Sequence, residues 1–374
     1  MIPVSKPDIR EEDINAVVEV LKSGRLSLGP KLKEFEDNFK DLIGTKYAIA
    51  VNSGTSGLHL CMKSLNLKKG DEVITTPFSF ISSANCVLYE GAKPVFVDVD
   101  DKTFNIDVNQ IEKKINEKTK AILPVHVFGH PCDMKEILRL SDKYNLDIVE
   151  DACESIGSAY NGRKVGTFGR ASVFAFYPNK QMTTGEGGMI CTNSQRVYNL
   201  CKSLRDQGRT DSGQWFSHDY LGYNYRLNDM SCALGVSQLK RFNDLIKERK
   251  KLANLYNDLF SDICGLVPPY VENYADHSWF VYVVKLDKHI NRDKLILVLN
   301  RKGVQTRPYF PAIHLQPLYK SMFGYKEGVF PITERLSQSS LALPFFVGLS
   351  EDDVHNVYKE IKNALKLVGG NAYG

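Results

Sequence analysis

The sequence predicts an α/β protein in which a large, mostly parallel sheet domain precedes a smaller C-terminal α+β domain. Three observations lead to this fold class. The chain has 374 residues, enough for one large domain or two of ordinary size. Up to about residue 192, short apolar runs alternate with longer amphipathic segments, which is typical of a parallel sheet covered by helices on both faces. Beyond about residue 240, a long amphipathic segment and an aromatic run end this alternation.

The elements of the sheet domain follow from spacing. A helix is predicted at 55–67, where apolar residues recur at helical intervals, and another at 134–144. The strands are predicted at the apolar runs 48–51, 73–74, 95–97, 121–125, 146–149, 172–176 and 188–191. The last two runs lie too close together for a helical crossover, so one of these strands is expected to be antiparallel.

The smaller domain is predicted from residue 241 onward, which gives domain boundaries of 1–240 and 241–374. A long amphipathic helix begins it, with apolar residues spaced between Phe242 and Leu259. An aromatic, strand-like run follows at 279–284, and then a helix near 292–302. A proline-containing stretch leads to a final helix that begins at Glu351.

Composition excludes several classes of protein. The net charge is only +4, from 48 basic and 44 acidic residues, so neither a nucleic-acid nor a membrane partner is expected. The eight cysteines are scattered, without the pairing of a disulfide framework or a zinc site, and no metal is expected. No apolar run approaches the ~18 residues that span a bilayer. We therefore expect a cytoplasmic protein with reduced thiols.

A segment of small and polar residues at 52–57 follows the strand predicted at 48–51 and opens the first helix. Small residues let the backbone approach an anion, and the first N–H groups of a helix can bind it. Gly54 and Thr55 are therefore candidates for a phosphate site. An ordinary helix cap by Ser53 or Thr55 explains the same residues equally well.

Two reactive side chains follow later strands. Asp151 comes just after the run at 146–149, where ligands of α/β sheets bind, although a turn or cap role is common for aspartate. Lys180 follows the run at 172–176 and precedes a glycine-rich return at 185–188. A lysine partly shielded from water favours Schiff-base chemistry there, whereas most lysines are simply solvated.

These three features together match the needs of pyridoxal 5′-phosphate (PLP). The cofactor requires an anion site for its phosphate, a lysine for a Schiff base and an acid that keeps the pyridine nitrogen protonated. Lys180 and Asp151 are thus the predicted catalytic pair. Phe80 is a candidate for stacking on the cofactor ring, with a place in the hydrophobic core as the equal alternative.

Four ordered motifs resemble those of the DegT/StrS family of sugar aminotransferases. They lie at 52–55 (Asn-Ser-Gly-Thr), 150–152 (Glu-Asp-Ala), 180–188 (Lys to Gly-Glu-Gly-Gly) and 222–226 (Gly-Tyr-Asn-Tyr-Arg). The resemblance implies the fold-type-I PLP aminotransferase architecture and a homodimer with shared active sites. It also implies transfer of an amino group from L-glutamate to a keto group of a nucleotide-linked deoxysugar.

The resemblance assigns roles position by position. It makes Lys180 the Schiff-base lysine, gives Asp151 the pyridine nitrogen and places Phe80 on the face of the ring. The other implied positions are Gly54 and Thr55 for the phosphate, Glu154 near the ring hydroxyl, Asn224 for the phosphate of the neighbouring subunit, and Arg226 and His314 for the substrate.

Two residues depart from the family pattern. Ala175 stands five positions before the lysine, where the family usually has a serine that binds phosphate, so we expect the phosphate to lose one hydrogen bond worth about 1 kcal/mol unless Ser53, Thr55 or a water replaces it. Glu154 stands where the family often has glutamine, and it adds a negative charge near the ring hydroxyl unless it is protonated. Cys153 lies two residues after Asp151 and is the one cysteine whose position makes a role near the cofactor worth testing.

The most specific expectation is amination at C4 of a 4-keto-6-deoxyhexose, as in perosamine synthases, for amino-sugar or cell-surface polysaccharide biosynthesis. Amination at C3, a cyclitol substrate and a non-catalytic regulatory protein on the same fold are the alternatives. Lys180 favours transamination over the 3-dehydratase reaction of relatives that carry histidine at this position. The nucleotide, whether GDP, UDP or dTDP, stays open.

Overall fold

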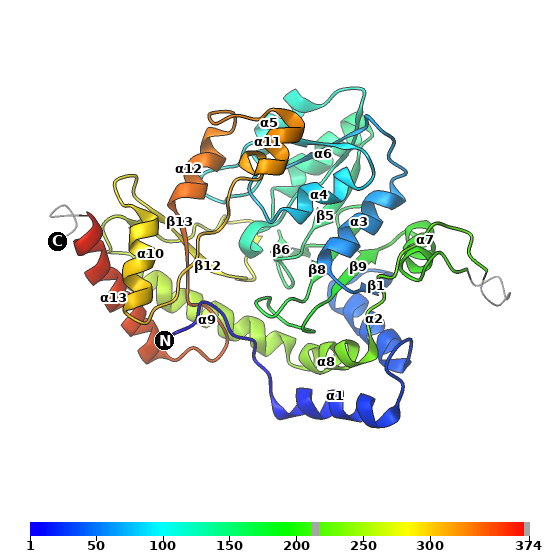
Figure 1. Ribbon diagram of the computed structural model, residues 1–374, viewed down its shortest axis with the longest axis horizontal. Coiled ribbons are helices and arrows are strands. Elements are labelled where there is room, and N and C mark those ends of the chain that lie inside the picture. The colour runs from blue at the N-terminus through cyan, green and yellow to red at the C-terminus, as the bar shows by residue number, and fades with distance from the viewer. Residues whose placement is uncertain (211–216, 370–374) are drawn as a thin grey trace.

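The computed structural model describes residues 1–210 and 217–369, and it confirms the predicted α/β architecture (Figure 1). A seven-stranded sheet forms the centre of the larger part, in the order β1-β9-β8-β5-β4-β2-β3. Its strands are β1 (Tyr47–Val51), β2 (Glu72–Thr75), β3 (Lys93–Phe96), β4 (Thr119–Ile122), β5 (Asp147–Asp151), β8 (Ala171–Ala175) and β9 (Gly188–Thr192). Each predicted apolar run of the sheet domain therefore overlaps a strand.

One strand of this sheet runs against the others, as the close spacing of the last two apolar runs predicts. Strand β9 is antiparallel to both β8 and β1, whereas the neighbours from β8 to β3 are parallel. Gly188 at the start of β9 pairs with Ala175 on one side and with Val51 on the other. The carboxyl ends of β1 and β8 therefore lie on either side of the start of β9.

Helices cover both faces because successive strand residues point to opposite sides. Ile49 and Val51 pack under α3 (Gly54–Ser64) and α7 (Gln195–Arg205), whereas Ala48 and Ala50 face α2 (Pro30–Ile43) and α8 (Asp229–Lys240). The other elements of this part are α1 (Glu11–Ser23), α4 (Ser82–Leu88), α5 (Val108–Ile111), α6 (Met134–Tyr144), β6 (Ala159–Tyr160) and β7 (Arg163–Lys164).

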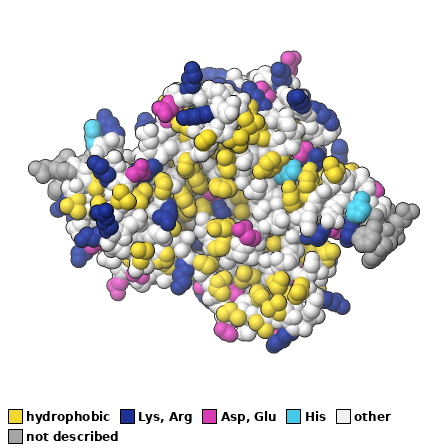
Figure 2. All heavy atoms as spheres, in the orientation of Figure 1, with side chains coloured by type: hydrophobic (Ala, Val, Ile, Leu, Met, Phe, Trp, Pro, Cys, Tyr) yellow, Lys and Arg dark blue, Asp and Glu magenta, His cyan; other side chains and the backbone are white. Residues whose placement is uncertain are grey.

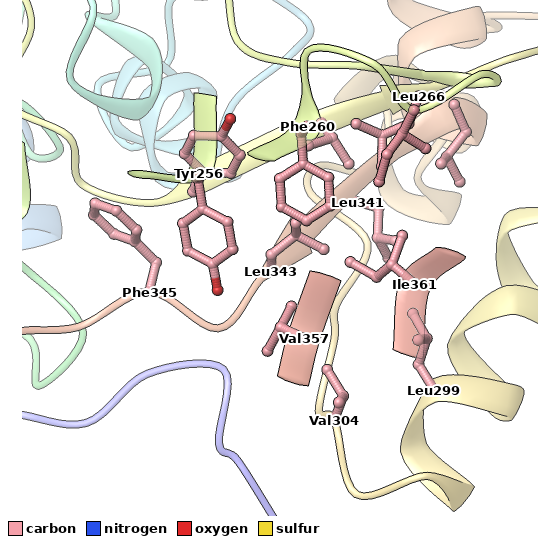
Figure 3. Close-up of a cluster of buried hydrophobic side chains, with 14 of the residues drawn as sticks. Tyr256, Phe260, Leu266, Leu299, Val304, Leu341, Leu343, Phe345, Val357 and Ile361 are labelled. Carbon is pink, nitrogen blue, oxygen red and sulfur yellow. The ribbon is translucent and has the colours of Figure 1, made fainter. Parts of the chain in front are cut away.

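A second, antiparallel sheet forms the C-terminal part, in the order β10-β12-β13. Its strands and helices are β10 (Leu266–Val267), β12 (Tyr282–Leu286), β13 (Ser340–Leu343), α9 (Phe242–Phe260), α10 (Arg292–Arg301) and α13 (Glu351–Gly369). Figure 3 shows its core, where Tyr256 and Phe260 of α9 lie with strand residues such as Leu341 and helix residues such as Ile361. Tyr256 stacks on Tyr282 with ring centroids 4.8 Å apart.

The predicted boundary at residue 240 falls between α8 and α9, and segments from each side cross to the other. Ile2 forms a bridge with Val304 in the C-terminal part. In the other direction, β11 (Ala275–Asp276) pairs with β6, and α11 (Pro317–Phe323) and α12 (Pro331–Ser339) flank a cluster that includes Phe96. Figure 1 shows these last two helices, in orange, beside the helices of the larger part. The boundary stays a prediction.

The surface shows no concentration of one charge on the face in view. Figure 2 shows lysine and arginine side chains spread over that face with aspartate and glutamate among them. Among residues 1–210 and 217–369, no helix has the length and apolar character needed to cross a membrane.

Candidate functional site

The turn between β1 and α3 forms a narrow cradle at the edge of the sheet. Ser53 caps α3, its hydroxyl accepting the N–H of Ser56 at 3.0 Å. A Cβ on Gly54 would lie 2.9 Å both from Cβ of Ala175 and from Sγ of Cys153. A Cβ on Gly188 would lie 2.6 Å from the carbonyl oxygen of Ser53. The glycines therefore allow the start of α3 to reach the ends of β8 and β5, which a larger residue would prevent.

Asp151 ends β5 beside this cradle, and its carboxylate is buried and held in a fixed orientation. Its Oδ2 accepts a hydrogen bond from the Ser83 hydroxyl at 2.7 Å, and its Oδ1 accepts the N–H of Cys153 at 3.1 Å. None of the ion pairs among the described residues includes this carboxylate. A buried carboxylate without an ion-pair partner among the described residues suits a ligand that brings a protonated nitrogen.

Lys180 follows β8, and its side chain is only 12% exposed. The Nζ atom lies 3.5 Å from Oε1 of Glu154 and 3.8 Å from the ring centroid of Phe280. Its backbone N–H donates to the Tyr177 carbonyl at 2.9 Å. The partial burial that the sequence predicts for this lysine is therefore present.

Glu154 lies between Lys180 and the backbone of a neighbouring loop. Its Oε2 accepts the N–H of Phe128 at 2.9 Å. Burial raises the pKa of this carboxyl above its ordinary value, and the charge of Lys180 opposes that rise. The same burial raises the pKa of Cys153 well above its usual range, so this cysteine is a neutral thiol beside the cradle.

Phe80 is 62% exposed, which excludes the alternative of a core phenylalanine. It precedes α4, and its carbonyl accepts a hydrogen bond from the N–H of Ser83. The neighbouring Ser82 hydroxyl lies 2.7 Å from Oγ1 of Thr55. The start of α4 thus connects the exposed ring, the buried carboxylate of Asp151 and the cradle.

The motif at 222–226 lies beside the cradle through its backbone. The N–H of Asn52 donates to the Tyr225 carbonyl at 2.9 Å, and the side chain of Asn224 is exposed. Arg226 donates to Oδ1 of Asp206 at 2.6 Å. No contact joins either Asn224 or Arg226 to Lys180 among the described residues of this chain, so their assigned roles stay predictions.

His314 is fully buried, and no hydrogen bond or ion pair joins it to Lys180 or Asp151 among the described residues. Its Nε2 is 3.0 Å from Oε1 of Glu334, and its ring packs edge-on against Phe330. Burial lowers the pKa of the ring, although Glu334 opposes this shift. The histidine supports the packing of this segment, and its predicted contact with the substrate stays a prediction.

Several residues that contribute contacts around the site were not predicted from the sequence. Ser83 and Ser82 hold Asp151 and Thr55, and the cluster of serines after Phe80 was the local signal that could have found them. Phe280 lies in an aromatic run that reads as a core strand, and it is one hundred positions away from the lysine it contacts. No local pattern predicts that contact.

Comparison with known proteins gives this geometry a family. The model of the DegT/DnrJ/EryC1/StrS aminotransferase family matches residues 7–362. Among curated proteins, the GDP-perosamine synthase of Vibrio cholerae is 35% identical, covering 98% of this chain and 100% of its own length. The spore coat polysaccharide biosynthesis protein SpsC of Bacillus subtilis is 37% identical, covering 98% of this chain and 97% of its own.

Solved structures agree with this match over nearly the whole chain. Helicobacter pylori PseC, an aminotransferase involved in pseudoaminic acid biosynthesis, superposes with a TM-score of 0.93 and 30% identity, over 98% of this chain and 99% of its own. Spr1654 of Streptococcus pneumoniae, in its PLP form, superposes with a TM-score of 0.92 and 27% identity, over 98% and 99% of the two chains. The expected family is therefore confirmed: the chain belongs to the DegT/DnrJ/EryC1/StrS aminotransferase family.

Proposed function

We propose that this aminotransferase uses PLP to move an amino group from L-glutamate to C4 of a nucleotide-linked 4-keto-6-deoxyhexose. The observation that carries the proposal is that a shielded amine, Lys180, and a buried carboxylate, Asp151, both follow or end adjacent strands of the sheet. The relatives support a sugar substrate, because one makes GDP-perosamine and another serves polysaccharide biosynthesis. We place the product in amino-sugar or cell-surface polysaccharide biosynthesis.

The residues present fit PLP in shape and in chemistry. The cradle at Gly54 has no room for a Cβ, and the N–H groups of α3 with the hydroxyl of Thr55 suit a phosphate. Asp151 suits a protonated pyridine nitrogen, and exposed Phe80 offers a face for stacking. Beside the lysine, Oδ1 of Asn179 is buried and has no partner among the described residues, as expected where a ligand completes the site.

When bound, PLP supplies an electron sink that makes the Cα–H of an amino acid acidic. Lys180 then acts as the general base that removes this proton from glutamate. In the second half-reaction the same amine delivers a proton to the sugar carbon that gains the amino group. Asp151 holds the charge of the pyridine nitrogen during both halves. The two substrates therefore react in turn, with ping-pong kinetics.

We propose further that two copies of the chain share their active sites. Asn224 carries this inference, because its side chain is exposed and no hydrogen bond or ion pair joins it to Lys180 or Asp151 among the described residues of its own chain. It would serve the cofactor phosphate of the neighbouring subunit. Arg226, in the same motif, and His314 are proposed for the sugar nucleotide.

The test is a panel of nucleotide-linked ketosugars assayed with glutamate, following 2-oxoglutarate release and assigning the aminated carbon by NMR. We expect activity on nucleotide-linked 4-keto-6-deoxyhexoses, giving products that carry the new amino group at C4. Release of 2-oxoglutarate with a 3-keto sugar or a cyclitol ketone alone would replace the proposed substrate but keep the chemistry.

The proposed role of Lys180 has its own test. Lys180→Ala is expected to abolish turnover and the visible absorbance of the bound cofactor. Lys251→Ala is the matched control, because Lys251 pairs with Glu351 at the surface. Multiple turnovers by Lys180→Ala would show that another group moves the proton. Absence of glutamate-dependent spectral change in the wild-type protein would favour the non-catalytic alternative.

A further inference from the structure

We propose that Arg249 of α9 positions the catalytic amine. It does this by fixing the backbone of Lys180 against the segment that carries Phe280. This inference rests on the proposed role of Lys180 as the cofactor-binding lysine. It adds a residue from the C-terminal part of the chain to the function of the site.

The guanidinium of Arg249 binds three backbone carbonyls from two distant segments. Its Nη2 donates to the carbonyl of Lys180 at 3.1 Å. Its Nη1 donates to the carbonyls of Trp279 at 3.1 Å and Phe280 at 3.2 Å. The planar fork of an arginine suits this bridge, because its donors point in fixed directions.

The side chains of the two bridged residues meet at the site. Nζ of Lys180 lies 3.8 Å from the ring centroid of Phe280. A lysine ammonium over an aromatic face is attracted by the ring electrons. Arg249 therefore holds the backbones of Lys180 and Phe280 close together, and the side chains of the same two residues meet.

Packing alone does not account for an arginine at this position. The side chain is 4% exposed, and no carboxylate forms an ion pair with it among residues 1–210 and 217–369. Its Nε has no hydrogen-bond partner there either. Burial lowers the pKa of this guanidinium to about 10, with no opposing charge. Burying a cation without a carboxylate partner is costly, so packing gives no reason for an arginine in place of an apolar side chain of similar size.

Further contacts tie the segment of Phe280 to the same site. The side chain of Gln181 donates to the Ser278 hydroxyl at 2.9 Å and to the Glu154 carbonyl at 2.6 Å. The N–H of Phe280 donates to the Phe128 carbonyl at 3.1 Å. Trp279 lies between Ser278 and Phe280 in the chain and has a φ of +54°. A tryptophan adopts this left-handed conformation only when its surroundings hold it.

This arrangement matters because the lysine must leave and return to the cofactor in every catalytic cycle. While free, its amine has a defined place between the Phe280 ring and the Glu154 carboxylate. Loss of Arg249 would leave the amine present but spread over several positions. Misplacement of a reacting group by about 1 Å costs roughly 100-fold in rate, so the loss should appear in kcat more than in KM.

The test compares Arg249→Gln and Arg249→Lys with a matched control, Arg241→Gln. Arg241 also anchors its surroundings, bonding Asp13 and Asp8, but it does not contact Lys180. Each variant is loaded with PLP, reduced with borohydride and mapped for the labelled peptide. The rate of labelling at Lys180, the visible spectrum per bound cofactor, and kcat and KM for glutamate are measured.

In Arg249→Gln we expect slower labelling, an altered spectrum and a kcat reduced roughly 100-fold with little change in KM, while Arg241→Gln loses stability only. Labelling and kcat equal to those of Arg241→Gln would overturn the inference. If Arg249→Gln does not fold, Arg249→Lys decides by the same comparison, since lysine keeps the charge but not the fork. Absence of label on Lys180 in the wild-type protein would instead refute the proposed function.

Discussion

The hydroxyl of Ser83 donates a hydrogen bond of 2.7 Å to the buried carboxylate of Asp151. The preceding residue, Ser82, contacts Thr55 at the cradle. The two adjacent serines at the start of α4 therefore join the acidic end of the site to its anion-binding end. A rigid link of this kind fixes the distance between the two ends of a ligand that spans them.

Ser83→Ala should destabilise the protein without cofactor. The substitution leaves Oδ2 of a buried carboxylate without its hydroxyl donor, at a cost of about 1–3 kcal/mol in the free energy of unfolding. Urea denaturation of the cofactor-free protein measures this change. Ser340→Ala is the control, because the hydroxyl of Ser340 is buried without a partner among the described residues and should be lost at little cost. Equal effects of the two substitutions would contradict the prediction.

Gly54→Ala should disrupt the cradle. The new methyl group would lie 2.9 Å from both Cβ of Ala175 and Sγ of Cys153, and such overpacking costs about 1–3 kcal/mol. We expect weaker PLP binding in a fluorescence titration and a lower unfolding midpoint. The double variant Gly54→Ala/Cys153→Ala removes one of the two clashes, so it should recover part of the loss. Strictly additive effects would mean that the cysteine is not what the methyl group meets.

Helices and strands were predictable from the sequence, because the pattern that specifies each of them lies within a short stretch of residues. The expected helix at 134–144 is observed as α6 over Met134–Tyr144, and the final helix begins at Glu351 as expected. The antiparallel strand among parallel ones followed from the shortness of one connection. The positions of Asp151, Lys180 and Gly54 at or just beyond strand ends were predictable, because ligands of α/β sheets bind there, while their roles toward a cofactor stay predictions.

Contacts between distant segments were not predictable from pattern. The aromatic run at 279–284 reads as one strand, but β12 covers Tyr282–Leu286, and Phe280 turns toward Lys180. The carbonyls that Arg249 binds have no signature in the sequence, because any residue has a carbonyl. The burial of His314 against Glu334 is likewise a tertiary effect that a motif cannot report.

Ala175→Ser should tighten PLP binding. Ala175 lies against the cradle, with its Cβ near Gly54, so a hydroxyl there would reach a phosphate held by α3. One added hydrogen bond is worth about 1 kcal/mol, which is roughly a fivefold lower Kd for PLP. Titration of the cofactor-free protein measures it, with Ala171→Ser at the far end of β8 as the control. An unchanged Kd would mean that the phosphate lies elsewhere.

Glu154→Gln should remove a pH dependence of stability. Burial raises the pKa of this carboxyl in the folded protein, so its protonated form is favoured. The stability that the protonated carboxyl gives to the folded protein is fully present at a pH below its pKa in the unfolded chain. This stability is lost as the pH rises through the pKa of the carboxyl in the folded protein. Glutamine resembles the protonated form. The free energies of unfolding of the two cofactor-free proteins should therefore agree in acid, and the variant should become the more stable as pH rises.

Glu334→Gln is the matched control, and its pH dependence should have the opposite sign. Burial alone would raise the pKa of Glu334, but hydrogen bonds from the N–H groups of Gly328 and Phe330 and from His314 hold it below the ordinary value. The stability that the ionised carboxylate gives to the folded protein is present at a pH above its pKa in the unfolded chain. This stability is lost as the pH falls through the pKa of the carboxyl in the folded protein. Wild-type protein and variant should differ at neutral pH and converge in acid. The same sign for both variants would contradict the assignment for Glu154.

Shared active sites predict complementation between two inactive variants. Lys180→Ala lacks the amine, and Asn224→Ala lacks the amide proposed to reach the neighbouring phosphate. In a mixed dimer, one site combines the intact lysine of one subunit with the intact asparagine of the other, and the second site lacks both. A single wild-type site is therefore restored only if the asparagine acts across the interface.

Denaturing and refolding the two variants in equal amounts makes half of the dimers mixed, each with one restored site. The mixture should therefore recover roughly a quarter of wild-type activity per subunit, well above either variant alone. Each variant refolded by itself is the control. If Asn224 instead served its own subunit, every site in the mixed dimer would lack one of the two groups, and no activity would return. The assay thus decides between a shared site and a self-contained one without a structure of the dimer.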